Sequence, residues 1–416
     1  MAHLLVVESW VGSMSRLLPR AIRESGHTFT FLTRDLHHYL RSAPEGTAHP
    51  LLGASNVVTA DTNDTDTLLP RVADLHGVFG FDGVVTSCDY YLPTVARIAA
   101  RLNLPGPGAQ AVENACRKDA TRRVLTDAGV PGPRFAVRTE WAELAGAARE
   151  IGYPLVVKPV DLCAGMFVRR VDDEAQLADA FRALSEFPVN ARGQRRDPAV
   201  LLEELLDGPE VSVETVSHAG TVHVIGVTDK SIGGQPAFIE TGHMFPAALS
   251  PADTEAAEHT ALAALKALGL VDGVVAHTEV KLTSSGPRIV EVNPRPAGNR
   301  ITELVRHVTG VDLAAAFVDV ALGLAPDLAR KDTGLASAAI GFVVPETSGT
   351  LEALDGGSLP GDLLEVQLAE PGRQVKAAGS NNEYLGHVMA GDPHSLAARD
   401  RVESALSTLR AGLVIR

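Results

Sequence analysis

The first hundred residues alternate short apolar segments with amphipathic ones, and this alternation constrains the fold more than any other feature. The apolar segments HLLVVES and HTFTFLTR flank the helical pattern SRLLPRAIRESG, and GVVTSCDYYLPTVARIAARLNL repeats the order of strand and helix. This order predicts a parallel sheet, because parallel neighbours need a crossover between them. Ligands of such sheets bind beyond the carboxyl ends of strands, which places Glu8, Ser9 and residues 86–90 at a predicted crevice. No GxGxxG follows the first strand, which weighs against a nicotinamide-dependent dehydrogenase.

The length of 416 residues exceeds what one hydrophobic core ordinarily supports, so two or three units are expected. A Pro/Gly cluster at 104–109 interrupts the first pattern, and ENACRKDATRRVLTDAG then predicts one helix that ends at Gly129. The following strands and helices predict a small α+β lobe, and hairpin-like strands predominate after it. In an α/β fold with α+β lobes, we therefore expect three domains, at 1–110, 111–200 and 201–416.

The net charge of −14 argues against general affinity for nucleic acid or an anionic membrane, because both depend on a basic face. No apolar run reaches the length of about 18 residues that a bilayer span requires, and the opening MAHLLVVESW predicts a strand rather than a signal peptide. Cys88, Cys116 and Cys163 are too few and too widely spaced for a disulfide framework. These features favour a cytoplasmic protein that acts on small molecules, with a homodimer as the commonest assembly.

The most informative stretch is HTEVKLTSSGPRIVEVNPRPAGN, in which two strands each carry a carboxylate. A three-residue loop at 284–286 sets Glu279 directly opposite Glu291. Asn293 lies on the same face, and opposed like charges destabilise a hairpin unless a cation lies between them. Two carboxylates and an amide oxygen suit Mg²⁺, which usually completes its shell with substrate phosphates, so the pattern predicts a metal site and a nucleotide. The alternatives are a solvated acidic face, or a two-residue loop that would put Glu279 opposite Val292.

Just after this hairpin, Arg295 stands between two prolines that stiffen the backbone. The stiff backbone fixes the direction of its guanidinium, so little conformational entropy is lost when this group binds a ligand. A planar guanidinium of this kind suits an acyl phosphate. Gly298, Asn299 and Arg300 precede a helical pattern, where backbone amides can hold an anion. A plain helix entry is the alternative for Asn299 and Arg300.

Lys158 ends the apolar strand PLVVK, an arrangement that buries its stem and presents the ammonium to a phosphate. The next turn, DLCAGMF, contains Gly165, which lets backbone N–H groups approach phosphate oxygens. One glycine is few for a phosphate loop, and Leu162 and Cys163 are at least as well explained as packing residues. No catalytic role is assigned to Cys163.

The segment LLEELLDGPEVSVE places Glu203 between apolar residues and Glu210 beyond a turn. Such a strand can offer backbone groups to an adenine edge, and Glu210 can accept hydrogen bonds from two ribose hydroxyls. An ordinary acidic surface strand is the alternative.

His243 follows Gly242 in GQPAFIETGHMFPA and precedes a turn, so it is expected on a loop, and Gly242 is a candidate substrate contact beside it. A lone histidine is more often structural, but between lobes it is a candidate to bind substrate or to take a proton from an amine. Lys230, at the end of HVIGVTDK, is a further phosphate or carboxylate candidate. The polar, basic segment 191–198 predicts a mobile loop.

Taken in this order, these residues resemble the ATP-grasp superfamily over roughly residues 1–325. The resemblance implies an ATP-grasp fold with an N-terminal Rossmann-like domain, a small central lid lobe and a larger C-terminal lobe. It implies ATP with two Mg²⁺ ions, for which Mn²⁺ can substitute. The residues that match the family's motifs are Lys118, Lys158, Glu203, Leu206 and Glu210 for the nucleotide, Glu279, Glu291 and Asn293 for the metal, and Arg295 for the acyl phosphate.

Within the superfamily, GHMFPA and NPRPAGNRITELVRHVTGVDL look most like the L-amino acid ligases that make dipeptides. The resemblance implies that a carboxylate becomes an acyl phosphate, that an amine attacks it, and that ADP and phosphate are released. The small lobe is expected to close and exclude water. An ATP-grasp carboxylase or formyl-phosphate transferase acting on bicarbonate or formate is the nearest alternative, and a nucleotide-binding protein without turnover is the second.

Overall fold

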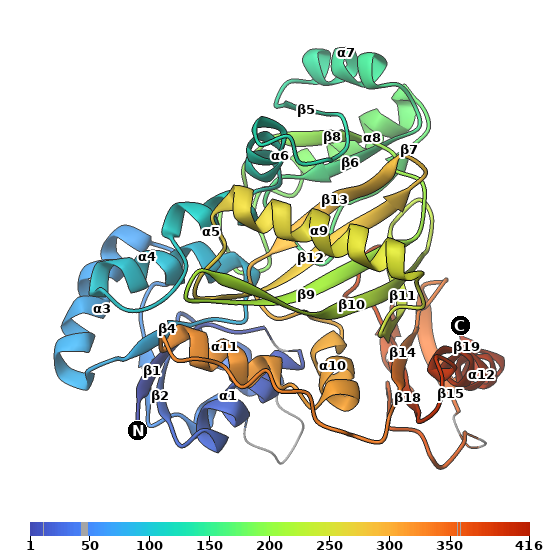
Figure 1. Cartoon of the computed structure of the whole chain (residues 1–416). Helices are drawn as coiled ribbons and strands as arrows, with labels where there is room; N and C mark the ends of the chain where they lie inside the picture. Colours follow the sequence, from blue (N-terminus) through green and yellow to red (C-terminus); the bar gives the residue numbers. More distant parts are fainter. Residues whose placement is uncertain (11, 43–48, 356, 358) are drawn as a thin grey trace.

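The computed structural model describes residues 1–416 except 11, 43–48, 356 and 358 (Figure 1). The first part of the chain forms the predicted parallel sheet, in the order β3-β2-β1-β4. Its strands are β1 (His3–Val7), β2 (Thr28–Thr33), β3 (Asn56–Thr59) and β4 (Gly83–Val85). The prediction of a parallel sheet in this part of the chain is therefore confirmed.

Helices cover both faces of this sheet. They are α1 (Met14–Glu24), α2 (Leu36–Ser42), α3 (Thr65–Phe79), α4 (Leu92–Leu102), the short 3-10 helices η1 (Pro50–Gly53) and η2 (Asp89–Tyr91), and, from much later in the chain, α11 (Leu313–Ala321). Because side chains alternate along a strand, Leu4 and Val6 join a core with α1 and α11, whereas Leu5 and Val7 face α3 and α4. Each such burial contributes about 1.5–3 kcal/mol.

The segment ENACRKDATRRVLTDAG forms two helices, α5 (Ala109–Cys116) and α6 (Lys118–Asp127). Arg117 between them has an extended backbone (φ −107°, ψ 112°), so the prediction of one helix is wrong. The cause is tertiary: the Arg117 guanidinium binds Asp119 and Asp197, and the Lys118 N–H donates to the Val160 carbonyl. This break places Lys118 at the start of α6 instead of inside a longer helix.

The small lobe, at the top of Figure 1, has an antiparallel sheet in the order β5-β8-β6-β7. Its elements are β5 (Phe135–Arg138), α7 (Trp141–Ile151), β6 (Leu155–Pro159), β7 (Arg169–Val171), α8 (Glu174–Ser185) and β8 (Val200–Glu204). Apolar side chains of α7 and α8 pack on the sheet through Leu144, Leu177 and Leu184. The predicted α+β lobe is present.

A long antiparallel sheet forms the centre of the molecule (Figure 1). In spatial order its strands are β13 (Gly286–Asn293), β12 (Val274–Thr283), β9 (Glu210–His218), β10 (Thr221–Gly233), β11 (Ile239–Phe245), β14 (Ser337–Val343), β18 (Gly386–Asp392) and β16 (Glu365–Leu368). Helix α9 (Pro251–Leu268) packs on one face, and α10 (Ile301–Thr309) and α11 pack on the other. One sheet therefore connects the predicted metal hairpin, β12–β13, to the strand that contains His243.

The last part of the chain extends this sheet through β14, β18 and β16. Beside them lie β15 (Gly349–Leu354), β17 (Gln374–Val375), α12 (Ala398–Ala411) and β19 (Leu413–Ile415). Helix α12 packs on β14 and β18 through Val402, Leu406 and other apolar side chains. In the part of the chain that the structure describes, no helix combines the length and apolarity needed to cross a membrane.

Candidate active site

The hairpin β12–β13 brings the two predicted metal-binding carboxylates together, although its loop is shorter than predicted. Thr283 pairs with Gly286, so the loop has two residues and the three-residue prediction is wrong. A β-bulge next to Glu279 then shifts the register by one residue, and Glu279 lies opposite Glu291 as predicted. The extra residue in the bulge is Val290. The predicted pairing is therefore correct because the bulge compensates for the shorter loop.

Each of these carboxylates has a lysine ammonium against it. Lys118 Nζ lies 2.8 Å from Glu291 Oε1, and Lys230 Nζ lies 2.5 Å from Glu279 Oε1. Burial disfavours ionisation of Glu279, but Lys230 and His277 outweigh it and lower the pKa of this carboxyl to about 2. Burial also disfavours the Lys118 ammonium, but Glu291 outweighs it and raises the Lys118 pKa. Glu279 is therefore ionised at neutral pH, as a metal ligand must be.

Lys230, a predicted phosphate or carboxylate contact, lies among glutamates of the protein itself. Its ammonium is 3.2 Å from Glu210, 3.2 Å from Glu240 and 2.5 Å from Glu279. Burial disfavours this ammonium, but the three carboxylates outweigh it and raise the Lys230 pKa well above its usual value. Glu210, the predicted ribose contact, also lies 3.5 Å from Lys281. Lys230 and Glu210, both predicted to contact ligands, therefore form ion pairs with other residues of the protein.

Lys158 and Glu203, on the neighbouring strands β6 and β8, form a second buried ion pair. Lys158 Nζ lies 2.6 Å from one Glu203 oxygen, and Arg122 Nε of α6 lies 2.6 Å from the other. Burial and Arg122 lower the Lys158 pKa, and the two cations lower the Glu203 pKa against the effect of burial. Arg122 also donates to the Val290 carbonyl in the bulge, so this cluster connects the small lobe to the hairpin. Leu206, half-buried, lies in the connection that follows β8.

Arg295 points toward the N-terminal domain. Its Nε donates to Asp89 Oδ1 (2.7 Å), and Trp10 Nε1 donates to Asp89 Oδ2 (2.6 Å). Burial disfavours the guanidinium, but Asp89 outweighs it and raises the Arg295 pKa. Sequence reasoning placed residues 86–90 at a crevice without singling out Asp89. Its partner lies 206 positions away, so no local signal could have identified the pair.

His243 lies within strand β11 and is 1% exposed, so its predicted loop position is wrong. The strand continues through this residue because it pairs with Lys230 of β10 and Ile340 of β14. His243 Nε2 lies 3.1 Å from Glu240 Oε2, and among the described residues neither ring nitrogen has a partner with hydrogen-bond geometry. Glu240, which sequence reasoning missed, also accepts a hydrogen bond from Asn299 Nδ2 (2.6 Å). The histidine, the amide and the carboxylate thus form one cluster.

The other predicted substrate contacts have packing or ion-pair roles. Gly242 lies so close to β14 that an added Cβ would be 2.7 Å from the Ile340 carbonyl oxygen, which explains a glycine there. Gly298 and Arg300 precede α10, as predicted. Arg300 Nη2 lies 2.8 Å from a Glu365 oxygen of β16, so its guanidinium is engaged by the last part of the chain.

The predicted crevice at the carboxyl end of β1 is filled. Glu8 is 2% exposed, and its carboxylate accepts hydrogen bonds from Thr33, Thr62 and the Arg34 N–H. Ser9 is fully buried. The prediction of an open crevice is therefore wrong at these two residues, because polar groups of the protein itself form hydrogen bonds with the residues at the end of the strand.

The segment 191–198, predicted to be a mobile loop, packs against the N-terminal domain. Arg192 and Arg196 are only 6% and 9% exposed. The Arg192 guanidinium lies 5.3 Å from the centroid of the Trp10 ring and donates to the Ser9 carbonyl. The Arg192 carbonyl accepts hydrogen bonds from two side chains of the N-terminal domain. The prediction from polar composition is therefore wrong, because arginine can be buried when its donors are satisfied.

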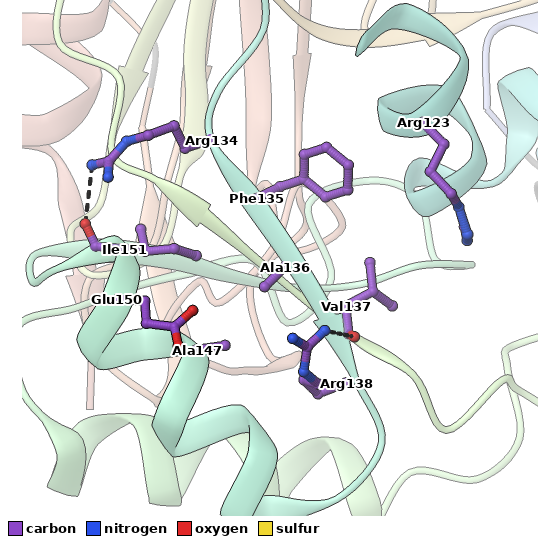
Figure 2. A pocket seen from close by; sticks show the side chains of 9 residues that line it. All are labelled: Arg123, Arg134, Phe135, Ala136, Val137, Arg138, Ala147, Glu150 and Ile151. Atoms are coloured by element: carbon purple, nitrogen blue, oxygen red, sulfur yellow. Dashed lines mark hydrogen bonds between the residues drawn. The ribbon is translucent and has the colours of Figure 1, made fainter. Parts of the chain in front are cut away.

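A cavity of about 500 Å³ lies where the N-terminal domain, segment 191–198 and β13 meet. Its lining includes Lys118, Glu291 and Asn293 from the predicted set, together with Asp89. A second hollow, of about 390 Å³, lies between α6, β5 and α7, and its lining, drawn in Figure 2, contains none of the predicted site residues. The first cavity is therefore the candidate active site.

Comparison with known families agrees with this fold. Residues 20–106 match the ATP-grasp N-terminal domain and residues 151–303 match the ATP-grasp domain. The chain therefore belongs to the ATP-grasp superfamily, whose enzymes use ATP with Mg²⁺. Residues 341–414 match the L-amino acid ligase C-terminal domain 2, which places the chain with the L-amino acid ligases within that superfamily.

Individual relatives agree with this placement. The chain is 30% identical over 396 residues to the uncharacterized protein y4rH of Sinorhizobium fredii, covering 93% of this chain and 80% of the relative. It is 29% identical to the alanine–anticapsin ligase of Bacillus subtilis over 61% of this chain, but spans only 56% of that protein. The crystal structure of an L-amino acid ligase from Bacillus licheniformis matches all of this chain and 98% of its own, with a TM-score of 0.82 and 25% identity.

The residues of the hairpin fit a magnesium ion. Glu279 and Glu291 are in register, and Asn293 ends the same strand as Glu291. Among the described residues, no group of three or more His, Cys, Asp and Glu side chains could hold a metal by itself. The ion would therefore need the amide oxygen and further oxygens from the substrate, which is the usual arrangement for Mg²⁺.

Proposed function

We propose that the protein is an ATP-dependent carboxylate–amine ligase that joins two amino acids, or amino-acid-like acids, through an acyl phosphate and releases ADP and phosphate. The observation that carries this proposal is the convergence of Lys118, Glu291 and Asn293 on one cavity with Asp89, the partner of Arg295. Similarity to the L-amino acid ligase from Bacillus licheniformis and to alanine–anticapsin ligase supports an amino acid as substrate.

In this proposal, Glu279, Glu291 and Asn293 would hold Mg²⁺, which when bound neutralises negative charge on the triphosphate. Lys118 and Lys158 contribute ammonium groups that position the γ-phosphoryl group. The first substrate's carboxylate attacks the γ-phosphorus, ADP leaves, and an acyl phosphate forms. The second substrate's amine then attacks the acyl carbon, loses a proton and displaces phosphate.

The remaining residues act on the second step. Arg295, aimed by its ion pair with Asp89, stabilises the oxyanion of the tetrahedral intermediate. His243 binds substrate or takes the proton from the amine, with Glu240 orienting its Nε2. Residues 194–198 line the cavity, and exclusion of water there would protect the acyl phosphate from hydrolysis.

We propose a matching division of labour along the chain. Residues 1–110 contact the substrates, residues 111–200 form the lid over the nucleotide, and residues 201–416 contain the metal hairpin and the mixed extension.

Phosphate release distinguishes this function from its nearest rival. Pairs of amino acids are supplied with MgATP, and ADP, phosphate and amide product are measured together. The proposal predicts ADP formation that depends on the amino acids and matches the amount of amide. ADP formation that depends instead on bicarbonate or formate would identify a carboxylase or formyl-phosphate transferase. If none of these substrates supports ADP formation, the result would favour a nucleotide-binding protein without turnover.

Replacing His243 is expected to impair the use of substrates without affecting the nucleotide. In His243→Ala, turnover or the apparent affinity for one amino acid falls by about 10²-fold, the lower range for loss of a general acid–base group. The affinity for ATP, measured by calorimetry, stays within about threefold. His259→Ala on the exposed surface of α9 is the control and retains wild-type kinetics. Unchanged kinetics for both substrates in His243→Ala would refute the assignment.

A further inference from the structure

Residues 380–384, in the last part of the chain, contact the predicted phosphate loop and strand β11. They follow β17 and precede β18, within the region that matches the L-amino acid ligase C-terminal domain 2. The Asn381 N–H donates to the Ala164 carbonyl (3.1 Å), and Asn381 Oδ1 accepts from the Glu240 N–H (2.9 Å). One residue thus connects the predicted phosphate loop to the strand that contains His243.

The same loop binds both sides of the Glu240 backbone. Asn381 accepts from the Glu240 N–H, and Tyr384 Oη donates to the Glu240 carbonyl (2.7 Å). The Glu240 carboxylate in turn contacts Lys230 (3.2 Å) and His243 (3.1 Å). A shift of the loop would therefore move the carboxylate that contacts both side chains.

The predicted phosphate loop needs outside support. Ala164, Gly165 and Phe167 have φ of 56°, 68° and 59°, and a left-handed backbone is unfavourable at a non-glycine residue. A strained turn persists only when the surrounding structure holds it in place. Asn381 supplies such a contact, because its N–H holds the Ala164 carbonyl and its Nδ2 lies 3.7 Å from where a Cβ on Gly165 would be.

The loop that supplies this support is itself held by hydrogen bonds and ring packing. Ser380 donates to Glu383 Oε2 from both its N–H (2.9 Å) and its hydroxyl (2.8 Å). The Tyr384 ring stacks on Phe342 at 4.3 Å, and Phe342 meets the edge of His243 at 5.8 Å. A group held by such packing can position its neighbours to within a fraction of an ångström.

We propose that Asn381 is a positioning residue that holds the phosphate loop and Glu240 in the relative placement that acyl transfer requires. Both steps of the proposed reaction need reacting atoms about 3–3.5 Å apart, and Asn381 connects the segment next to the γ-phosphate to the segment next to the substrates. The inference rests on the proposed ligase function. It also assigns a role to the last part of the chain, which supplies the contact between the phosphate loop and strand β11.

Loss of this connection is expected to uncouple ATP use from amide formation. Asn381→Leu has a similar volume and keeps the backbone N–H that donates to the Ala164 carbonyl, but it loses the Oδ1 that accepts from the Glu240 N–H. Water then replaces the amine as the attacking group. The acyl phosphate then returns the carboxylate and releases phosphate, so ADP forms without amide. The ratio of amide to ADP is expected to fall at least twofold, with a smaller fall in Tyr384→Phe, which loses one hydroxyl and keeps the ring stack.

The control is Asn382→Leu, because among the described residues the Asn382 side chain donates only to Ser380. Its ratio is expected to match the wild type. A reduced fraction of folded enzyme lowers amide and ADP equally, so a merely structural role would leave the ratio unchanged. A wild-type ratio in Asn381→Leu would overturn the proposal.

Hydrogen exchange tests the same residue without relying on ligase activity. With Mg²⁺ and a non-hydrolysable ATP analogue, the peptide covering 238–243, which contains the Glu240 N–H that loses its acceptor, is expected to exchange at least threefold faster in Asn381→Leu than in the wild type. Helix α12 is expected to keep its wild-type protection in the same sample. If the wild type forms no amide with any amino acid pair, the ligase function fails, and this measurement alone decides the role of Asn381. Wild-type exchange at 238–243 in Asn381→Leu would then overturn it.

Discussion

Replacing Glu291 by glutamine lowers amino-acid-dependent ADP formation by at least about 10²–10³-fold, the size of effect expected when a group that stabilises transition-state charge is lost. Glu291 lies opposite Glu279 and lines the candidate cavity with Asn293. Glutamine has the same shape but no charge, so the hairpin keeps its register while a Mg²⁺ ligand is weakened. Initial rates of ADP formation at saturating amino acids measure the effect.

The Glu291 variant needs a control for charge and for folding. Glu255→Gln makes the same change of charge on the exposed surface of α9, and it is expected to keep full activity. Because Glu291 is 27% exposed and Lys118 retains its hydrogen bond to the Leu162 carbonyl (2.6 Å), circular dichroism of Glu291→Gln should match the wild type. Full ADP formation by a folded Glu291→Gln protein would contradict the metal assignment.

Replacing Glu203 by leucine destabilises the protein by about 3–5 kcal/mol at pH 7, because it leaves two buried cations without their shared carboxylate. Arg122 and Lys158 are 3% and 7% exposed, and each lies 2.6 Å from a Glu203 oxygen. Unfolding in urea, followed by circular dichroism, measures the loss. The matched control is Glu204→Leu, which breaks an ion pair with the 63% exposed Arg134 and costs at most about 1 kcal/mol.

The pH dependence of the Glu203 effect has a defined sign. The folded-state pKa of Glu203 is lower than its usual 4.5, so the folded protein binds fewer protons at this site than the unfolded chain. Its contribution is therefore complete at neutral pH and decreases as the pH falls below about 4.5 toward the folded-state value. The difference between wild type and Glu203→Leu should narrow in acid. A difference that stays constant down to the acid unfolding transition would show that the ion pairs do not cause it.

The most accurate sequence-based predictions concerned local patterns. The apolar alternation of the first hundred residues predicted the parallel sheet, and two strands around one turn predicted the pairing of Glu279 with Glu291. Register within a hairpin depends on a few adjacent residues, so it can be derived by counting. Even here the predicted loop was one residue too long, and the predicted pairing holds only because Val290 forms a bulge. A bulge has no reliable sequence signal.

Predictions that depended on distant partners were less accurate. The segment 191–198 looked mobile because it is polar and basic, but Trp10 and Ser9 provide a buried place for Arg192. His243 was expected on a loop because glycine and proline flank it, but pairing with β10 and β14 draws it into a strand. In both cases the free energy of tertiary contacts exceeds the local preference.

By itself, the sequence determined the superfamily, the parallel and antiparallel character of the successive parts, and the facing carboxylates of the hairpin. These follow from periodicity, which neighbouring residues impose on each other through backbone geometry. Only the tertiary structure decided which charged side chains form ion pairs with each other and which distant segments come into contact. It paired Arg295 with Asp89, surrounded Lys230 with glutamates, and brought Asn381 to the phosphate loop. An ion pair in a protein interior depends on distance in space and on burial, and neither can be read from positions along a chain when the partners lie on different strands, helices or loops.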